Sequence, residues 1–150
     1  MAGLGLLPTA RLFVASCRGD GITPARAHGV RERPIYTHPM PDADTVHLLL
    51  STCPDAESAE AIARALVGEG LAACVTRWPG AHSLYRWNGA VESAEEVQLL
   101  IKTRGDRLEA AIARLCALHP YDLPEAVAIA ASAGLPAYLD WVRAQTSEDS

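Results

Sequence analysis

The chain has 150 residues, nearly half of them hydrophobic, and this predicts one compact domain with a sizeable core. Its 13 basic and 18 acidic residues give a formal net charge of -5, and no stretch is rich in lysine or arginine. Proteins that bind nucleic acid usually carry a basic patch, so we expect no nucleic-acid partner. No apolar run approaches the roughly 20 residues that cross a bilayer, so we expect no membrane insertion.

The first 44 residues differ in pattern from the rest of the chain. They hold neither a helical nor a strand period, whereas a regular pattern begins at Thr45. We therefore predict that residues 1–44 are a disordered or misannotated extension and that residues 45–150 form the domain. A secretion signal is disfavoured because the start is uncharged and Pro8 and Arg11 interrupt the apolar run. Met40 stands directly before the first regular pattern, which suggests that translation begins there; mass spectrometry of the native protein would test this.

The first half of the predicted domain contains a strand, a helix and a second strand. The almost continuously apolar residues 46–50 predict a covered strand. Residues 59–70 carry apolar side chains at helical spacing and predict an amphipathic helix. Residues 71–87 alternate as a strand does, and Pro79-Gly80 interrupts the alternation. Because proline cannot donate to a ladder, we expect a bulge there, on an edge strand.

The second half begins with a turn. Asn88-Gly89 is typical of a tight hairpin, and residues 95–102 predict the returning strand. Asp106 and Glu109 resemble a capping box at the start of a helix that Pro120 ends. A short strand over residues 126–131 and a short helix around residues 138–142 complete the pattern.

The resulting order, βαββαβα, predicts the fold class. Two right-handed β-α-β crossovers around an internal hairpin give an α+β, ferredoxin-like split βαβ sandwich with a C-terminal helix. The bent strand over residues 72–87 then lies at an edge of an open sheet. An edge with exposed aromatic residues favours association, so we expect edge-to-edge oligomers; a monomer by light scattering would contradict this.

Cys74 and His119 are the candidate metal ligands. A thiolate with an imidazole favours copper or zinc over magnesium or calcium. Each residue also has a purely structural interpretation: His119 caps the helix that it ends while Tyr121 packs, and Cys74 is a small buried apolar residue. Both interpretations stay open. The four cysteines form no C-x-x-C pair, which disfavours a disulfide framework or a structural zinc module and favours a reducing cytoplasm.

Other polar and aromatic residues have weaker functional signals. Tyr85 and Trp87 are expected to be core or interface anchors, and Lys102 could steer an anion. The cluster of Glu95 and Glu96 with Glu92 is expected to be solvated or paired across strands. The chain lacks G-x-S-x-G, a phosphate-binding glycine loop and H-E-x-x-H, so we expect neither catalysis nor an organic cofactor.

Several motifs in order along the chain resemble the CutA divalent-cation tolerance family. They are GLAACV at 70–75, PG at 79–80, SLYRWNG at 83–89, EVQLLIKT at 96–103, HPYDLPE at 119–125 and YLDW at 138–141. The resemblance covers about residues 46–142. It implies a ferredoxin-like subunit in a tightly packed homotrimer, in the bacterial cytoplasm, linked to tolerance of copper and other divalent metals, with no known catalytic activity.

The resemblance also bears on the metal ligands. Copper in the family is associated with cysteine and histidine positions, and Cys74 and His119 occupy matching places. Some bacterial members place a cysteine at the end of the first strand. Here the thiol, Cys53, is shifted by two residues, which moves it by about 6 to 7 Å and argues against Cys53 as a ligand.

Two functions follow as alternatives. The first is a trimeric metal-responsive protein that binds copper(II) or other divalent cations weakly through Cys74, His119 or both. The second is a trimeric signalling or adaptor module that binds a small anionic ligand or a protein partner in its intersubunit clefts, with Lys102, Tyr121 and Glu125 lining the site. Tyr85 and Trp87 are further candidates for that cleft. An acylphosphatase-like hydrolase is disfavoured, because the residues after the first strand form no arginine-bearing, glycine-rich phosphate loop.

Overall fold

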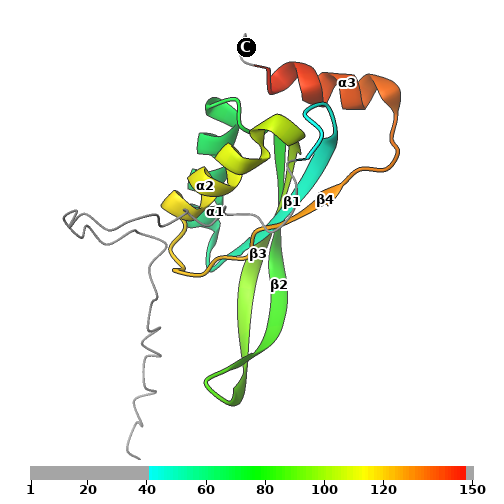
Figure 1. Ribbon diagram of the computed structural model, residues 1–150. Helices are drawn as coiled ribbons and strands as arrows, with labels where there is room; N and C mark the ends of the chain where they lie inside the picture. Colours follow the sequence, from blue (N-terminus) through cyan, green and yellow to red (C-terminus); the bar gives the residue numbers. More distant parts are fainter. Residues whose placement is uncertain (1–40, 148–150) are drawn as a thin grey trace, which may run out of the picture.

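The computed structural model describes residues 41–147, and its element order confirms the predicted βαββαβα pattern (Figure 1). The elements are β1 (Val46–Cys53), α1 (Ala56–Gly68), β2 (Cys74–Trp87), β3 (Ala90–Arg104), a 3-10 turn η1 (Gly105–Arg107), α2 (Leu108–Leu118), β4 (Val127–Ala130) and α3 (Pro136–Gln145). Residues 1–40 lie outside the described part of the chain, so the nature of the predicted extension stays a prediction. No helix within residues 41–147 is long and apolar enough to cross a membrane.

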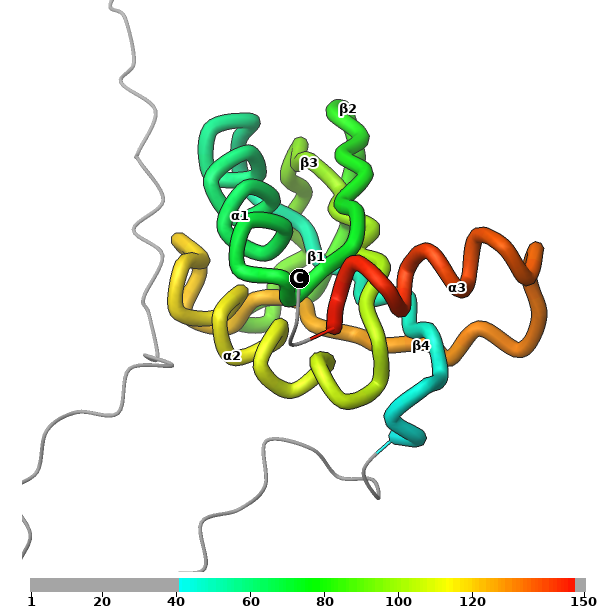
Figure 2. The backbone as a smooth tube through the Cα atoms, turned by 90° about the horizontal axis from the view of Figure 1, so that it is seen from above, coloured from blue at the N-terminus to red at the C-terminus, as the bar shows by residue number. Residues whose placement is uncertain are grey.

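The four strands form one antiparallel sheet in the order β2-β3-β1-β4. This order confirms the ferredoxin-like class, because the hairpin partner β3 lies beside β1 and the last strand closes on its other side. α1 and α2 cover one face of the sheet (Figures 1 and 2). α3 lies apart from that pair, and its Val142 packs with Val46 at the start of β1. Much of the opposite face is therefore left open.

The core lies between the sheet and the helix pair α1 and α2. Alternate residues of β1 and β3 point toward the helices and are buried there. The fully buried members include Leu49, Leu99 and Ile101 from strands and Ile62, Leu66 and Leu115 from helices. Burying one such side chain stabilises the fold by roughly 1.5–3 kcal/mol, so this layer holds the sheet edge and the helix ends in place.

The hairpin and the bulge lie where the sequence predicts them. Asn88 and Gly89 both have positive φ, 47° and 85°, as a two-residue type I′ turn requires. The pairing of β2 with β3 shifts between Trp78 and Ala81, and Gly80 between them has a φ of 78°. β2 is an edge strand, so the interrupted ladder leaves only this outer strand bent.

The predicted capping box is wrong. The side chain of Asp106 bonds the guanidinium of Arg104, and the N-terminus of α2 has no side-chain cap. The chain enters α2 through the η1 turn instead. A capping aspartate does exist at α1, where the Asp55 carboxylate accepts the Ser58 N–H at 2.8 Å.

Residues just before β1 contact the body of the domain. The Arg143 guanidinium donates to the Asp44 carbonyl at 2.8 Å, and the Thr45 N–H donates to the Asp42 carbonyl at 3.0 Å. A Cβ on Gly105 would lie 2.1 Å from that same Asp42 oxygen. Among the described residues, contacts with the domain therefore extend back to Asp42, N-terminal to the predicted start at Thr45.

Candidate functional site

His119 follows α2 directly, and its ring reaches the end of β1. Its Nδ1 accepts the N–H of Tyr121 at 3.0 Å, and its Nε2 lies 2.8 Å from the carbonyl oxygen of Thr52. A nitrogen that accepts carries no proton, so the proton of the neutral ring is on Nε2, which donates to Thr52. His119 thus occupies the C-cap position of α2, as predicted, but its side chain bonds a carbonyl of β1 rather than one of that helix.

Cys53 lies beside this histidine. Its Sγ is 3.6 Å from His119 Nε2, and its side chain is fully buried. Burial, together with the smaller effect of the nearby carboxylates of Asp55 and Glu96, raises the pKa of the Cys53 thiol to about 11. Burial also lowers the pKa of His119. At neutral pH the pair is a thiol and a neutral imidazole, so it lacks the thiolate that an activated nucleophile needs.

Tyr121 connects the histidine to a buried carboxylate. Its hydroxyl donates to Glu96 at 3.1 Å, and Ser83 donates to the other oxygen of the same carboxylate. Glu96 is only 6% exposed. Burial raises the pKa of Tyr121, and its bond to Glu96 adds to the rise, so the phenol stays protonated as a donor. Of the two predicted states of Glu96, solvated or paired across strands, the second is confirmed, because Ser83 on the neighbouring strand β2 bonds its carboxylate. Tyr121 in the loop after α2 adds a second donor.

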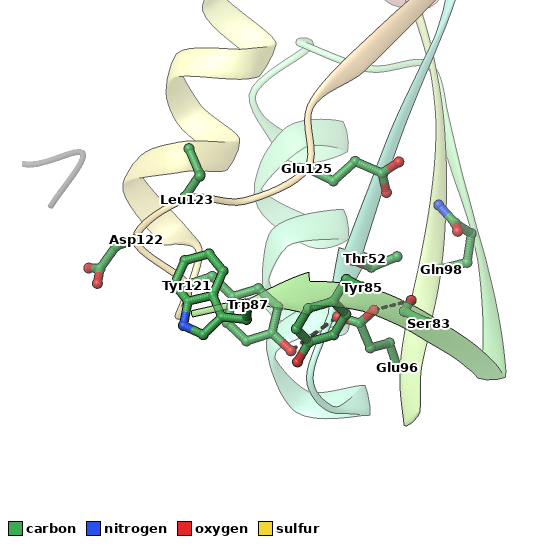
Figure 3. Close-up of a pocket in the computed structure, with 10 residues that line it drawn as sticks. All are labelled: Thr52, Ser83, Tyr85, Trp87, Glu96, Gln98, Tyr121, Asp122, Leu123 and Glu125. Carbon is green, nitrogen blue, oxygen red and sulfur yellow. Dashed lines mark hydrogen bonds between the residues drawn. The ribbon is translucent and has the colours of Figure 1, made fainter. Parts of the chain in front are cut away.

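A cavity of about 670 Å³ opens around this carboxylate (Figure 3). Its lining is acidic, aromatic and neutral polar, and consists of Thr52, Ser83, Tyr85, Trp87, Glu96, Gln98, Tyr121, Asp122, Leu123 and Glu125. Four of the five predicted cleft residues, Tyr85, Trp87, Tyr121 and Glu125, come together here. Thr52 and Gln98 pair across β1 and β3, and the next pair, Cys53 and Val97, points into the core beneath the helices. Because successive side chains alternate, the cavity lies on the sheet face away from α1 and α2.

Lys102 is not part of this cavity. Its Nζ donates to the Thr76 hydroxyl at 2.6 Å and to the Leu100 carbonyl at 3.1 Å. Gln98 and Lys102 share one face of β3, but they lie about 13 Å apart along the strand. Lys102 is also buried, and its amine bonds these neutral groups, so within the subunit it brings no positive charge to the cavity.

Cys74 and His119 do not share one site within the subunit. Cys74 begins β2 opposite Lys102, whereas Cys53, the neighbour of His119, lies opposite Val97. This register separates the two regions by about 17 Å of strand. Within residues 41–147, no group of three or more His, Cys, Asp or Glu side chains is arranged to hold a metal ion. The assignment of Cys74 and His119 as ligands stays a prediction.

Sequence reasoning did not assign Ser83, Glu96 or Cys53 to the site, although the strand period could have indicated the first two. Ser83 is two residues from Tyr85 and four from Trp87, and Glu96 is two residues from Gln98. The strand period of two therefore places each set on one strand face. Cys53 was set aside because of its shifted position. Its partnership with His119 depends on where α2 ends relative to β1, which the spacing within one strand cannot reveal.

A four-stranded antiparallel sheet, covered on one face by two helices and carrying an acidic and aromatic cavity on the other, defines a small ferredoxin-like α+β domain of the open-faced kind. Residues 47–145 match the family described as CutA1 divalent ion tolerance protein. The chain therefore belongs to the CutA1 divalent ion tolerance family.

Individual relatives agree with this membership. The divalent-cation tolerance protein CutA of Thermus thermophilus is 46% identical over 99 residues, which are 66% of this chain and 96% of that protein. The crystal structure of CutA from Xylella fastidiosa has a TM-score of 0.67 at 59% identity and covers 68% of this chain and 98% of its own. A structure described as a periplasmic divalent cation tolerance protein CutA, from Archaeoglobus fulgidus, has a TM-score of 0.66 at 33% identity, with 68% and 99% covered.

Proposed function

We propose that the protein is a homotrimeric, non-catalytic divalent-cation tolerance protein that binds copper or another soft metal ion through Cys53 and His119. The relatives' shared name supports the link to divalent-cation tolerance. One observation carries the second: the 3.6 Å between Cys53 Sγ and His119 Nε2. Metal–sulfur and metal–nitrogen bonds of about 2.3 and 2.0 Å at a tetrahedral angle separate the two ligand atoms by about 3.5 Å.

The surroundings explain what such binding would require. Binding must release the thiol proton to solvent and move the ring proton of His119 from Nε2 to Nδ1, which gives up the bonds to the Thr52 carbonyl and from the Tyr121 N–H. The high pKa of the thiol opposes this step. However, the Asp55 and Glu96 carboxylates that raise that pKa also favour a bound cation. With two side-chain ligands and the Thr52 carbonyl as a third donor, binding should be much weaker than in a closed four-ligand site.

Cys74 is a separate candidate in this proposal. A site that uses both Cys74 and His119 needs a second subunit, because one subunit keeps them apart. The buried amine of Lys102 also lies opposite Cys74 and disfavours a cation beside that thiol. We therefore infer that Cys53, rather than Cys74, provides the sulfur ligand.

Assembly is supported by the open face of the sheet and by its edges. Strand alternation and register place three apolar residues on the face that α1 and α2 leave open. These residues, Trp78, Val127 and Ile129, are therefore 49%, 51% and 53% exposed. β2 and β4 are both edge strands. Apolar side chains at an open face and edge favour a neighbouring subunit. Light scattering of the full chain should give three times the subunit mass; a monomer would contradict the trimer.

We also infer a cytoplasmic location, since the buried Cys53 and the half-buried Cys74 are free thiols in this fold. A relative described as periplasmic makes fractionation of native cells the proper measurement. Recovery of the protein with periplasmic markers would contradict the inference.

Calorimetric titration tests the metal proposal. Reduced protein is titrated with zinc(II) and with copper(I), the state that copper takes with a thiol reductant. Cys53→Ser and His119→Ala should each lower the affinity by at least about tenfold, because one of two side-chain ligands is lost. Cys74→Ser, the matched control, should leave it unchanged. Equal affinity in all four proteins would contradict the proposal.

The alternative function, a signalling or adaptor module, is supported by the presence of a cavity. The charge of the cavity does not support the predicted anionic ligand. Three carboxylate side chains line the cavity, and no lysine or arginine does. An anionic ligand would therefore meet repulsion there.

A further inference from the structure

We propose that the cavity around Glu96 binds a small organic cation, an amine or quaternary ammonium compound, between aromatic faces and a buried carboxylate. The cavity is distinct from the Cys53–His119 pair, so the proposal holds whether or not a metal binds there.

Glu96 is a buried carboxylate whose hydrogen-bond partners are uncharged. Its carboxylate is nine-tenths buried, and both oxygens accept hydrogen bonds from neutral hydroxyls, those of Ser83 and Tyr121. Within residues 41–147, no lysine or arginine forms an ion pair with it. A buried carboxylate without an opposite charge is costly even when it is hydrogen-bonded. A cationic ligand in the cavity would provide the missing charge.

Aromatic rings form part of the cavity wall. Tyr85 and the Tyr121 hydroxyl lie beside the Glu96 carboxylate, and Trp87 lies farther from it on the cavity wall (Figure 3). Tyr85 and Trp87 remain 39% and 37% exposed, so their surfaces are open to a ligand in this subunit. The face of an aromatic ring attracts a cation within about 6 Å, with roughly 0.5–2 kcal/mol per contact. Rings beside a carboxylate are the combination that recognises alkylammonium groups.

The remaining polar groups suit an ammonium ion better than a metal ion. The Gln98 amide nitrogen is already bonded to the Ser51 carbonyl at 2.8 Å, so the lining amide can turn only its oxygen, an acceptor, toward a ligand. Glu125 adds a second carboxylate on the cavity wall (Figure 3). A hard metal ion would need about six oxygen ligands, whereas both Glu96 oxygens are engaged and much of the wall is aromatic.

The size of the cavity agrees with a small molecule. A volume of about 670 Å³ falls within the range of roughly 300–1,000 Å³ that is usual for small-molecule sites. The cavity is therefore large enough to hold a choline-sized cation.

The test uses choline and its neutral isostere 3,3-dimethyl-1-butanol, with the full chain in EDTA so that metal plays no part. Binding is followed by heteronuclear NMR, including the indole N–H of Trp87. We expect saturable shifts with choline and at least about tenfold weaker binding of the isostere, because only choline carries the charge. Equal affinity for the two probes, or tighter binding of citrate, would overturn the proposal.

Variants locate the site. Glu96→Gln and Trp87→Leu should each weaken choline binding by about tenfold or more, and Tyr85→Leu serves in place of Trp87→Leu if that variant does not fold. Glu95→Gln, an exposed neighbour outside the cavity, is the matched control and should bind as the wild type does. Absence of saturable binding, or a crystal structure of the oligomer in which a neighbouring subunit's arginine or lysine fills the cavity, would overturn the proposal.

Discussion

The hydroxyl of Tyr121 donates a 3.1 Å hydrogen bond to the Glu96 carboxylate, while the N–H of Tyr121 donates to Nδ1 of His119. The two bonds explain the His-Pro-Tyr motif as one unit. His119 anchors the loop to β1, and the loop in turn holds Tyr121 against a buried charge on β3. The site thus depends on an anchor that does not itself line the cavity.

Removing the Tyr121 hydroxyl should destabilise the domain. Tyr121→Phe leaves the buried Glu96 carboxylate with Ser83 as its donor, and we expect the free energy of unfolding to fall by about 1–3 kcal/mol. Urea denaturation measures the change. Tyr138→Phe is the matched control, because in the described residues the Tyr138 hydroxyl has no hydrogen bond and its ring is 42% exposed. A loss in the control equal to that in Tyr121→Phe would contradict the interpretation.

The stability of the domain should fall as pH is lowered because of His119. Burial lowers the pKa of His119 below 6.5 in the folded state, so below that pH the unfolded state binds more protons. The contribution is complete above about pH 6.5 and is lost as pH falls through this value toward the folded-state pKa. Unfolding free energies measured between about pH 7.5 and about 5.5 give the slope.

His119→Gln separates this titration from the other groups. Glutamine can still donate an N–H to the Thr52 carbonyl, but it does not titrate, so its profile should be flatter than that of the wild type. His82→Gln, at an exposed position, should keep the wild-type slope. A His119→Gln profile as steep as that of the wild type would show that another group is responsible.

Gly105 tests whether the residues before β1 belong to the fold. In Gly105→Ala the new Cβ would lie 2.1 Å from the Asp42 carbonyl oxygen, so backbone must move and we expect a loss of about 1–3 kcal/mol. Gly68→Ala is the control, because a Cβ there meets nothing within 4 Å and alanine favours the helix by about 0.5–1 kcal/mol. Thermal denaturation of both variants compares them; a neutral Gly105→Ala would place the start of the domain at Thr45.

Local sequence patterns were sufficient to predict the architecture. The bulge follows from Pro79-Gly80, the hairpin follows from Asn88-Gly89, and the helices follow from apolar spacing, because each depends on residues that are neighbours in sequence. The predicted capping box is wrong for a local reason as well, because the Asp106 carboxylate accepts a hydrogen bond from Arg104, two residues earlier.

The site was only partly predictable, because its members come from separate elements. The His-Pro-Tyr motif directed attention to the correct loop, but the partners of that loop, Cys53 and Glu96, depend on the register of β1 with β3. Within one subunit, Lys102 lies with Thr76 and Cys74 rather than in the cavity, although it is on the same strand as Glu96. Its place in an intersubunit cleft stays a prediction. Distances between elements of this kind do not appear in a single sequence.

Cobalt(II) substitution tests most directly whether Cys53 and His119 bind one metal ion. A cobalt–thiolate bond gives a ligand-to-metal charge-transfer band in the near ultraviolet, which identifies the sulfur that binds. We predict that the reduced wild type and Cys74→Ser both develop this band when cobalt is added, and that Cys53→Ser does not. A band that persists in Cys53→Ser and disappears in Cys74→Ser would contradict the assignment.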